Sequence, residues 1–188
     1  AVAKSLVSID LINIRDFGVG KHKMVDDTPY GGGVGMVMRV DVIHEAIKAT
    51  RIPGKRERIM LMTASGHPFT QQKARFFSEF DHLIIICGHY EGIDDRIRSF
   101  IDEEISLGDF VTTGGELPAM LITDAVVRLL PDVLKPEATA FESFSLTKEQ
   151  GSTSTLLEYP HYTRPAEYLG ESVPEVLISG DHQKIDSW

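Results

Sequence analysis

The sequence predicts an α/β fold built on a parallel β-sheet. Three apolar segments rich in β-forming residues each run into a glycine-containing turn, and they cover residues 58–66, 82–92 and 103–115. The segments between them carry apolar residues at helical spacing. Strands that alternate with helices along a chain are typical of parallel sheets joined by helical crossovers.

The three predicted strands are "RIMLMTASG", "HLIIICGHYEG" and "EEISLGDFVTTGG", whose apolar runs indicate strands buried on both faces. Ligands bind outside the carboxyl ends of the strands in sheets of this kind. Three turns fall at that edge: the first loop (residues 63–66), the second loop (residues 87–92) and the third loop (residues 107–115). We therefore expect one binding site that these three loops share.

Two helices are expected between the strands, in residues 70–80 and 93–101. The apolar residues at about helical spacing in them are Phe76, Phe77, Phe80, Ile93, Ile97 and Ile101. Such spacing places apolar side chains toward one face, so each helix is predicted to pack on the sheet.

A third helix is expected in residues 116–134, directly after the third loop, with Pro131 ending it. Its predicted buried face consists of Leu117, Leu121, Ala125 and Leu129. Asp124 and Arg128 are four residues apart on a common side, and a surface ion pair is the plain interpretation of that spacing.

The composition changes after this helix. Residues 143–155 are rich in serine, threonine and glycine, which is typical of a flexible linker. We predict a main domain over residues 1–134 and a linker over residues 135–160, with residues 161–188 following it.

The composition also limits the class of protein. The chain has 188 residues, of which 42% are hydrophobic, so it can bury a real core. Cys87 is the single cysteine, and the seven histidines are scattered, so neither a disulfide nor a zinc site is indicated. No apolar run approaches the roughly 20 residues of a membrane span. A reduced cytoplasmic protein with no membrane contact is expected.

The net charge of −9 argues against wrapping by nucleic acid, but its distribution is uneven. Residues 1–58 hold ten lysines and arginines against seven acidic residues, whereas residues 59–188 hold nine against twenty-one. Two basic clusters, residues 21–23 and 51–58, account for much of the positive charge. Each is either a solvated loop or a local contact to a polyanion.

The stretch "SLGDFVTTGGELPAM" invites comparison with phosphate-binding loops, because backbone amides before a helix N-terminus can bind anions. A P-loop requires a lysine after its last glycine, and here Glu116 follows Gly115. The dinucleotide-binding pattern is not completed either, in this stretch or in "YGGGVGMVM". A near-neutral or cationic ligand is therefore expected.

Four long motifs carry a resemblance to a known family: "DDTPYGGGVGM", "CGHYEGIDDR", "SLGDFVTTGGELPAM" and "YPHYTRP". Their sequences and order resemble those of bacterial tRNA (guanine-N1)-methyltransferases of the SPOUT class. The resemblance extends over nearly the whole chain, and four long motifs in order are far more specific than one glycine pattern. It implies methylation of the N1 atom of the guanosine at tRNA position 37, beside the anticodon.

The resemblance also implies an architecture. The carboxyl-end loops of the sheet would form a deep trefoil knot, which general folding rules make improbable. Two copies of the chain would form a homodimer whose active site is shared between the subunits. Residues 161–188 would begin a small helical C-terminal domain that binds tRNA. A further family strand would precede Ala1 and further helical residues would follow Trp188.

The resemblance implies S-adenosylmethionine as the methyl donor, and Mg²⁺ as a further candidate ligand, although no unambiguous metal site is visible in the sequence. Residues of the three loops would bind the donor, together with one distant glutamate. They are Leu61, Met62, Thr63, Ala64, Gly88, Tyr90, Glu91, Leu107, Gly108, Asp109, Phe110, Val111, Thr112, Gly114, Gly115, Pro118 and Glu158. Glycine leaves the backbone open to adenine, and carboxylates such as Glu91 and Glu158 favour the sulfonium and ammonium groups.

The catalytic residues that the resemblance implies are Arg128 and Glu142. The family arginine that stabilises charge on guanine O6 corresponds to Arg128, in place of the surface ion pair considered above. The family base is an aspartate directly before Ser-Phe, and in the shorter segment "FESF" the carboxylate at that place is Glu142. The substrate-binding residues would be Tyr30, Gly31, Gly32, Gly33, His161 and Arg164.

Two other classes of protein remain open at this point. A noncatalytic or truncated S-adenosylmethionine- and RNA-binding module of the same fold would explain the altered base segment. A nucleotide-phosphate hydrolase would use the glycine loops, but its phosphate-binding lysine and its pair of metal-binding carboxylates are not evident.

Overall fold

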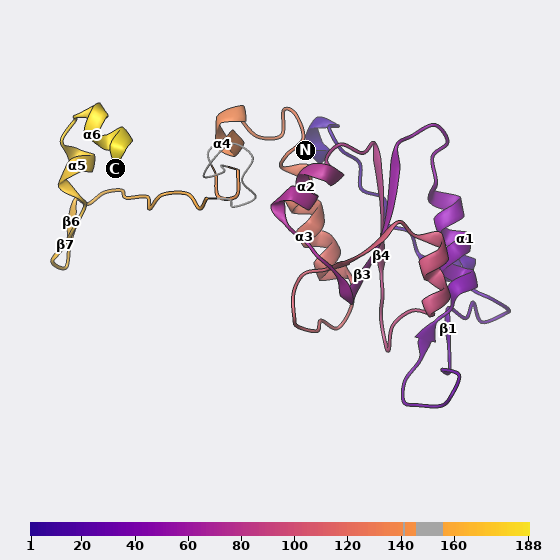
Figure 1. Ribbon diagram of the computed structural model, residues 1–188. Coiled ribbons are helices and arrows are strands. Elements are labelled where there is room, and N and C mark those ends of the chain that lie inside the picture. Colours follow the sequence, from indigo (N-terminus) through magenta and orange to yellow (C-terminus); the bar gives the residue numbers. More distant parts are fainter. Residues whose placement is uncertain (141, 146–155) are drawn as a thin grey trace. The chain divides into compact units, whose positions relative to one another are not determined.

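The computed structural model describes residues 1–140, 142–145 and 156–188 (Figure 1). The chain divides into two compact units, Ala1–Ala140 and Phe141–Trp188, each of which is described by itself. Part of the predicted linker over residues 135–160 lies outside the described residues, namely 141 and 146–155.

The first unit is an α/β structure around a three-stranded parallel sheet. The strands are β3 (Glu57–Pro68), β4 (His82–Cys87) and β5 (Glu103–Ser106), in the order β4-β3-β5. Both neighbours pair with β3 in parallel register. The α/β class and the parallel sheet predicted from the sequence are therefore confirmed.

The central strand β3 is longer than predicted. Ile105 pairs with Met62 and again with His67, so the residues between them leave the ladder as a bulge and the strand then resumes. Gly66 makes this possible, because a Cβ atom there would lie 2.5 Å from the backbone nitrogen of Ile105. The first loop is thus a bulge within one strand, and the prediction that the strand ends at residue 66 was wrong.

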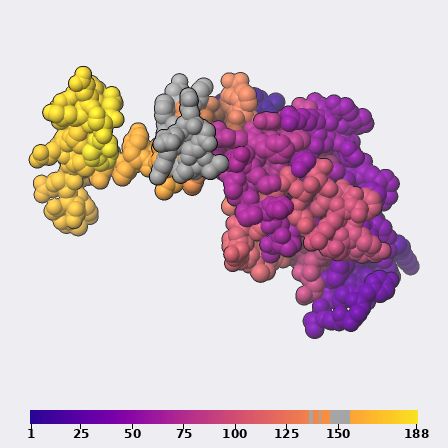
Figure 2. All heavy atoms as spheres, in the orientation of Figure 1, coloured from indigo at the N-terminus to yellow at the C-terminus, as the bar shows by residue number. Residues whose placement is uncertain are grey.

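Helices cover both faces of the sheet (Figure 1). One apolar cluster joins α1 (Val40–Thr50) and the 3-10 helix η3 (Asp95–Phe100) to β3 and β4. On the other face, a second cluster joins α2 (Gln71–Phe77) and α3 (Glu116–Val127) to the sheet. Side chains fill the spaces between the ribbons of this unit (Figure 2).

The two helices predicted between the strands differ in type. Within residues 70–80, α2 covers Gln71–Phe77, and the side chain of its N-cap residue Thr70 accepts a hydrogen bond from the Lys73 N–H. Residues 93–101 form only the 3-10 turns of η3, because the Asp94 carboxylate accepts the Arg96 N–H at the start and an extended Ile101 ends the turns. The expected α-helix in that segment was wrong in type but right in placing Ile97 in the core.

The helix after the third loop presents a different face to the core from the one predicted. Leu117 and Leu121 are 65% and 51% exposed, whereas Ile122 and Val126 are buried. Ala125 and Leu129 pack partly against the same cluster. The helix is apolar on both sides, so spacing alone could not identify the buried one. It ends at Val127, before the Pro131 that was expected to end it.

The remaining elements of the first unit are short. Two-residue strands β1 (Asp26–Asp27) and β2 (Val37–Met38) pair in antiparallel fashion just before α1. The 3-10 helices η1 (Val2–Lys4) and η2 (Ile14–Phe17) precede them, and α4 (Pro136–Ala140) follows α3.

The second unit contains a small hairpin and two short helices. Its elements are β6 (Glu167–Tyr168), β7 (Glu171–Ser172), α5 (Glu175–Ile178) and α6 (His182–Ser187). In neither unit does a helix of the described residues reach the length and apolar character needed to cross a membrane.

Candidate functional site

A pocket of about 220 Å³ opens at the bulge of β3 and the carboxyl end of β4. The first loop contributes Thr63 and Ser65, and the second contributes Gly88 and Glu91. Leu61 and Met62, at the end of the regular part of β3, complete the predicted residues that line it. The first two loops therefore meet in one pocket, as the parallel sheet predicts.

The pocket is acidic. Glu91, Asp95 and Glu104 line it, and Arg98 is the one lining residue with a positive charge. The Nε atom of Arg98 lies 3.1 Å from Asp95 Oδ1 and 3.2 Å from Glu104 Oε1. These contacts offset its charge, so the carboxylates dominate and the pocket favours a cationic ligand over a phosphate.

The third loop packs against the second. The Gly115 N–H donates to the Gly88 carbonyl at 2.8 Å, and His89 pairs with Gly114 in an antiparallel bridge. A Cβ atom at Gly115 would lie 2.6 Å from the Cα atom of Cys87, so the contact requires glycine. The two glycines that first suggested a phosphate-binding loop serve instead to bring two backbone segments together.

The third loop contacts the second loop but contributes no residue to the lining of this pocket, which therefore joins two of the three loops expected to share one site. Its turn is held by the Ser106 hydroxyl, which bonds both the N–H and the carbonyl of Gly108, and by the Thr112 hydroxyl, which donates to the Gly114 carbonyl at 2.8 Å. Phe110 and Val111 are exposed. None of the predicted residues Leu107, Gly108, Asp109, Phe110, Val111 or Thr112 is among those that line the pocket.

The glycine-rich loop between β1 and β2, residues 28–36, borders the second loop. Gly31, Gly32, Gly33 and Gly35 all have positive φ values there. The Glu91 N–H donates to the Met36 carbonyl at 3.1 Å. A Cβ atom at Gly35 would lie 2.5 Å from the Cγ atom of Glu91. The predicted guanine loop and the predicted donor pocket are therefore adjacent, with Glu91 between them.

Two further predicted site residues of the first unit lie outside the pocket lining: Tyr30, in the glycine-rich loop, and Arg128, directly after α3. Tyr30 is wholly exposed at the start of the glycine-rich loop. Arg128 is the residue that ends α3, and its N–H donates to the Asp124 carbonyl at 3.2 Å. Pro118 lies in the first turn of the same helix, so α3 connects the third loop to Arg128.

The other predicted site residues belong to the second unit. The Glu158 N–H donates to the Ser143 hydroxyl at 3.0 Å, and the Glu158 carboxylate lies 2.9 Å from His161 Nε2. Glu142 is the neighbour of Ser143, and its carbonyl accepts the Ser145 N–H. This unit therefore groups Glu142, Glu158 and His161 along two adjoining segments, while Arg164 is exposed beyond them.

The second basic cluster is largely neutralised within the protein. Arg51 pairs with Glu57 at 3.0 Å, Arg56 with Glu79 at 3.3 Å and Arg58 with Glu103 at 3.1 Å. The Ile52 N–H, the His82 ring and Arg51 all bond the Glu57 carboxylate and lower its pKa to about 2. The cluster thus has less positive charge to offer a polyanion than its sequence suggests.

Burial, with a smaller effect of Glu116, raises the pKa of the Cys87 thiol to about 11. The thiolate is therefore scarce at neutral pH, which makes Cys87 a poor nucleophile. This residue forms part of the wall against which Gly115 packs.

Sequence reasoning missed four polar residues that line the pocket, Ser65, Asp95, Arg98 and Glu104, and it did not assign Gly92, Ile93 or Ile97 to the site. The charged sequence "DDRIR" was the available signal for Asp95 and Arg98, but the segment was interpreted only as a helix between two strands. Charged pairs on a surface helix are common, so the pattern could not identify a pocket without the placement of η3 against the first loop.

Comparison with known proteins agrees with this arrangement. The family model described as tRNA (Guanine-1)-methyltransferase TrmD matches residues 1–188. The tRNA (guanine-N(1)-)-methyltransferase of Desulfitobacterium hafniense is 50% identical over 188 residues, which are 100% of this chain and 69% of the relative. Those of Carboxydothermus hydrogenoformans and Bacillus subtilis are 51% and 50% identical, and the match covers 100% of this chain and 71% and 75% of the relatives. The chain belongs to the tRNA (guanine-1)-methyltransferase family.

Proposed function

We propose that the protein transfers a methyl group from S-adenosylmethionine to the N1 atom of the guanosine at tRNA position 37. The observation that carries this proposal is the contact between the glycine-rich loop and the second loop, in a chain that matches the family over its whole length. That contact places a loop suited to a flat base beside an acidic pocket suited to a sulfonium.

The described residues fit the methyl donor. The acidic pocket supplies carboxylates for the sulfonium and ammonium groups. When bound, S-adenosylmethionine supplies an electrophilic methyl group. In the proposal, residues of the first two loops hold its charged end, and residues 107–112 close over its adenosine.

Transfer to guanine N1 requires removal of the N1 proton and stabilisation of negative charge on O6. Glu142 accepts the proton as the general base, and Arg128 stabilises the charge on O6. Arg128 belongs to the first unit and Glu142 to the second. Neither residue needs the scarce Cys87 thiolate, and no covalent enzyme intermediate is involved.

The guanine enters beside the glycine-rich loop. A base in the anticodon loop is single-stranded, so it can be turned out without the cost of melting a duplex. The exposed Tyr30 ring offers a stacking surface at the start of that loop, and glycines 31–33 allow the base to approach the backbone. His161 and Arg164, in the second unit, are proposed contacts to the tRNA backbone.

A homodimer is part of the proposal, and the exposed side of α3 supports it. Leu117, Met120 and Leu121 are 65%, 66% and 51% exposed on a helix that runs directly from the third loop. An apolar helix face of this kind is typical of an interface, and a second copy of the same chain is the occupant proposed here. The partner's second unit would then bring Glu142 to the loops of the first subunit.

The knot, the role of residues 161–188, the cellular location and the role of Mg²⁺ are also proposals. The family relation supports a trefoil knot formed by the three loops and a tRNA-binding role for residues 161–188. It also supports a cytoplasmic location, where tRNA is processed. Among the residues that the structure describes, no group of three or more possible metal ligands comes together, and a role for Mg²⁺ stays a prediction from the resemblance.

The acidic pocket also distinguishes this function from a nucleotide-phosphate hydrolase. Glu91, Asp95 and Glu104 would repel a triphosphate. Calorimetric titration should therefore detect binding of S-adenosylmethionine and not of ATP.

The transfer itself is tested with labelled S-adenosylmethionine and unmodified tRNA transcripts that carry either guanosine or adenosine at position 37. We expect label only in the guanosine transcript. Label in both transcripts would refute the assigned position, and label in neither, with the methyl donor still bound, would favour a noncatalytic binding module.

A further inference from the structure

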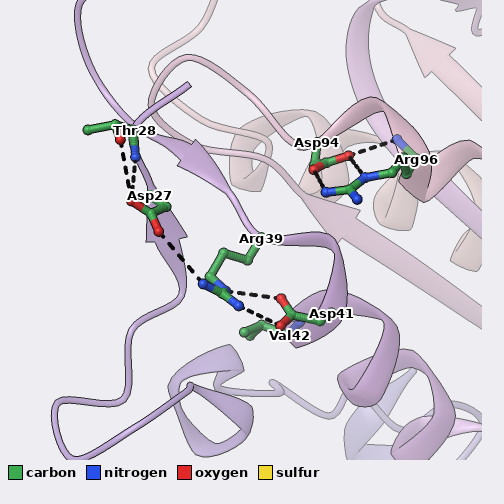
Figure 3. A network of polar contacts seen from close by, with 7 residues as sticks. All are labelled: Asp27, Thr28, Arg39, Asp41, Val42, Asp94 and Arg96. Carbon is green, nitrogen blue, oxygen red and sulfur yellow. Dashed lines mark hydrogen bonds and ion pairs between the residues drawn. The ribbon is translucent and has the colours of Figure 1, made fainter. Parts of the chain in front are cut away.

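Arg39 lies where the glycine-rich loop returns to the body of the first unit. Its Nε and Nη2 atoms bond the two carboxylate oxygens of Asp41 at 3.0 and 2.7 Å, and Nη1 lies 3.7 Å from Asp27 Oδ2 (Figure 3). The Arg39 side chain is 28% exposed, so it is more sheltered than either carboxylate. One guanidinium therefore joins β1, which enters the loop, to the start of α1, which follows it.

The loop has little else to hold its two ends together. Only two residue pairs, Asp26 with Met38 and Asp27 with Val37, connect β1 to β2. A ladder this short is marginal on its own. The Arg39 N–H adds one more bond, 2.8 Å to the Val25 carbonyl. The contact between Arg39 and Asp27 is the side-chain link across the base of the loop.

The same end of the loop is joined to the second loop. The Met38 N–H donates to the Gly92 carbonyl at 2.9 Å, and the Asp94 N–H donates to the Met38 carbonyl at 3.0 Å. Asp94 in turn bonds Arg96 through both carboxylate oxygens, at 2.9 and 2.6 Å (Figure 3). A shift of β2 would therefore displace the second loop at the edge of the donor pocket.

The charge of Arg39 is already neutralised. The hydrogen bonds that Arg39 donates to Asp41 are the main reason that the pKa of Arg39 is raised, and Asp27 adds a smaller electrostatic contribution. Two carboxylates around one guanidinium leave no excess positive charge for an RNA phosphate. This distinguishes Arg39 from a residue that binds the tRNA backbone.

We infer that Arg39 is a positioning residue, which fixes the width of the glycine-rich loop at its base and so aligns the guanine with the donor pocket. The inference rests on the proposed function, because it assigns the loop to the guanine. It concerns the alignment of the base and assigns Arg39 no contact with it.

Replacement by alanine tests this without removing a helix cap, because the Arg39 side chain makes no capping hydrogen bond to α1. Hydrogen exchange measured on the whole chain should show faster exchange of the amides of residues 28–38 in Arg39→Ala, by roughly two- to fivefold, the size expected for a partly exposed ion pair. Asp27→Asn should reproduce the change. The control is Lys48→Ala, which removes the exposed pair of Lys48 with Glu45 on α1 and should leave the loop unchanged.

The enzymatic measurement separates positioning from phosphate binding. Arg39→Ala should lower kcat/KM for tRNA by a similar roughly two- to fivefold factor, with the Kd of S-adenosylmethionine unchanged. The slope of log affinity for tRNA against log salt should also be unchanged, whereas loss of one phosphate contact would reduce it by about 0.7 to 0.9. Arg39→Lys keeps the charge but not the paired hydrogen bonds. Its kcat/KM for tRNA should therefore lie between that of the unaltered protein and that of Arg39→Ala.

Unchanged exchange in residues 28–38 of Arg39→Ala would overturn the inference, as would a reduced salt slope. The exchange measurement needs no tRNA. If the unaltered protein fails to methylate tRNA, the proposed function fails, and loop exchange still decides whether Arg39 holds the loop.

Discussion

At the scale of single residues, the site separates the task of binding from the task of proton transfer. Glu91 lies between the glycine-rich loop and the pocket, where its position suits a cationic donor. Glu142 and Arg128, the two proposed catalytic residues, lie in different units of the chain. The side chains proposed to hold the donor are thus distinct from those proposed to act on the guanine.

The distinction leads to a prediction for the two catalytic residues. Glu142→Gln keeps the shape of the side chain but cannot accept the N1 proton, so it should retain the Kd of S-adenosylmethionine and lose most methylation, by about 10²- to 10⁴-fold. Arg128→Ala should likewise lower kcat far more than donor affinity. Binding is measured by calorimetry and turnover by label transfer. Unchanged turnover in Glu142→Gln would rule out this base, and a collapse of donor affinity in Arg128→Ala would make the arginine structural.

At the scale of elements, glycines set how closely the loops approach one another. Gly66 lets the bulge of β3 lie against β5, and Gly115 lets the third loop lie against the end of β4. The same residue type has a different use in the glycine-rich loop, where positive φ values shape the turn. Long glycine motifs can therefore serve backbone packing as well as ligand contact.

Gly115→Ala tests the packing role. Its Cβ atom would meet the backbone of Cys87 at 2.6 Å, and overpacking of this kind costs about 1 to 3 kcal/mol. We expect a lower free energy of unfolding in urea and weaker donor binding, because the second and third loops would separate. Gly88→Ala is the matched control for stability, since its Cβ atom would meet the Ile93 side chain at 3.6 Å and the Met62 carbonyl oxygen at 3.9 Å, both ordinary contact distances. Equal stability of the two variants would show that the close contact is not needed.

The exposed side of α3 carries a second prediction at this scale. Leu121→Glu places a charge in the apolar face, so light scattering should report a monomer where the unaltered chain gives a dimer. Leu11→Glu is the control, because Leu11 is 94% exposed but lies outside α3. A dimer that persists in Leu121→Glu would place the interface elsewhere.

At the scale of the whole molecule, the sequence predicted the strand order in the chain, the parallel sheet and the edge at which the loops gather. It could do so because buried strands and the turns after them have local signals. The buried side of α3 could not be predicted, since Leu117 and Ile122 are both strongly apolar. Which of them is buried depends on how the helix packs against the sheet. The link from Arg39 to Asp27 was also hidden, because ion pairs between separate segments leave no pattern of spacing.

The most direct test of the central claim is the identity of the methylated nucleoside. The whole chain is incubated with S-adenosylmethionine and an unmodified tRNA transcript, and the RNA is then digested and analysed by mass spectrometry. The account predicts 1-methylguanosine from a transcript with guanosine at position 37 and none when adenosine replaces it. A methyl group on another atom of guanine, or 1-methylguanosine that survives this replacement, would contradict it.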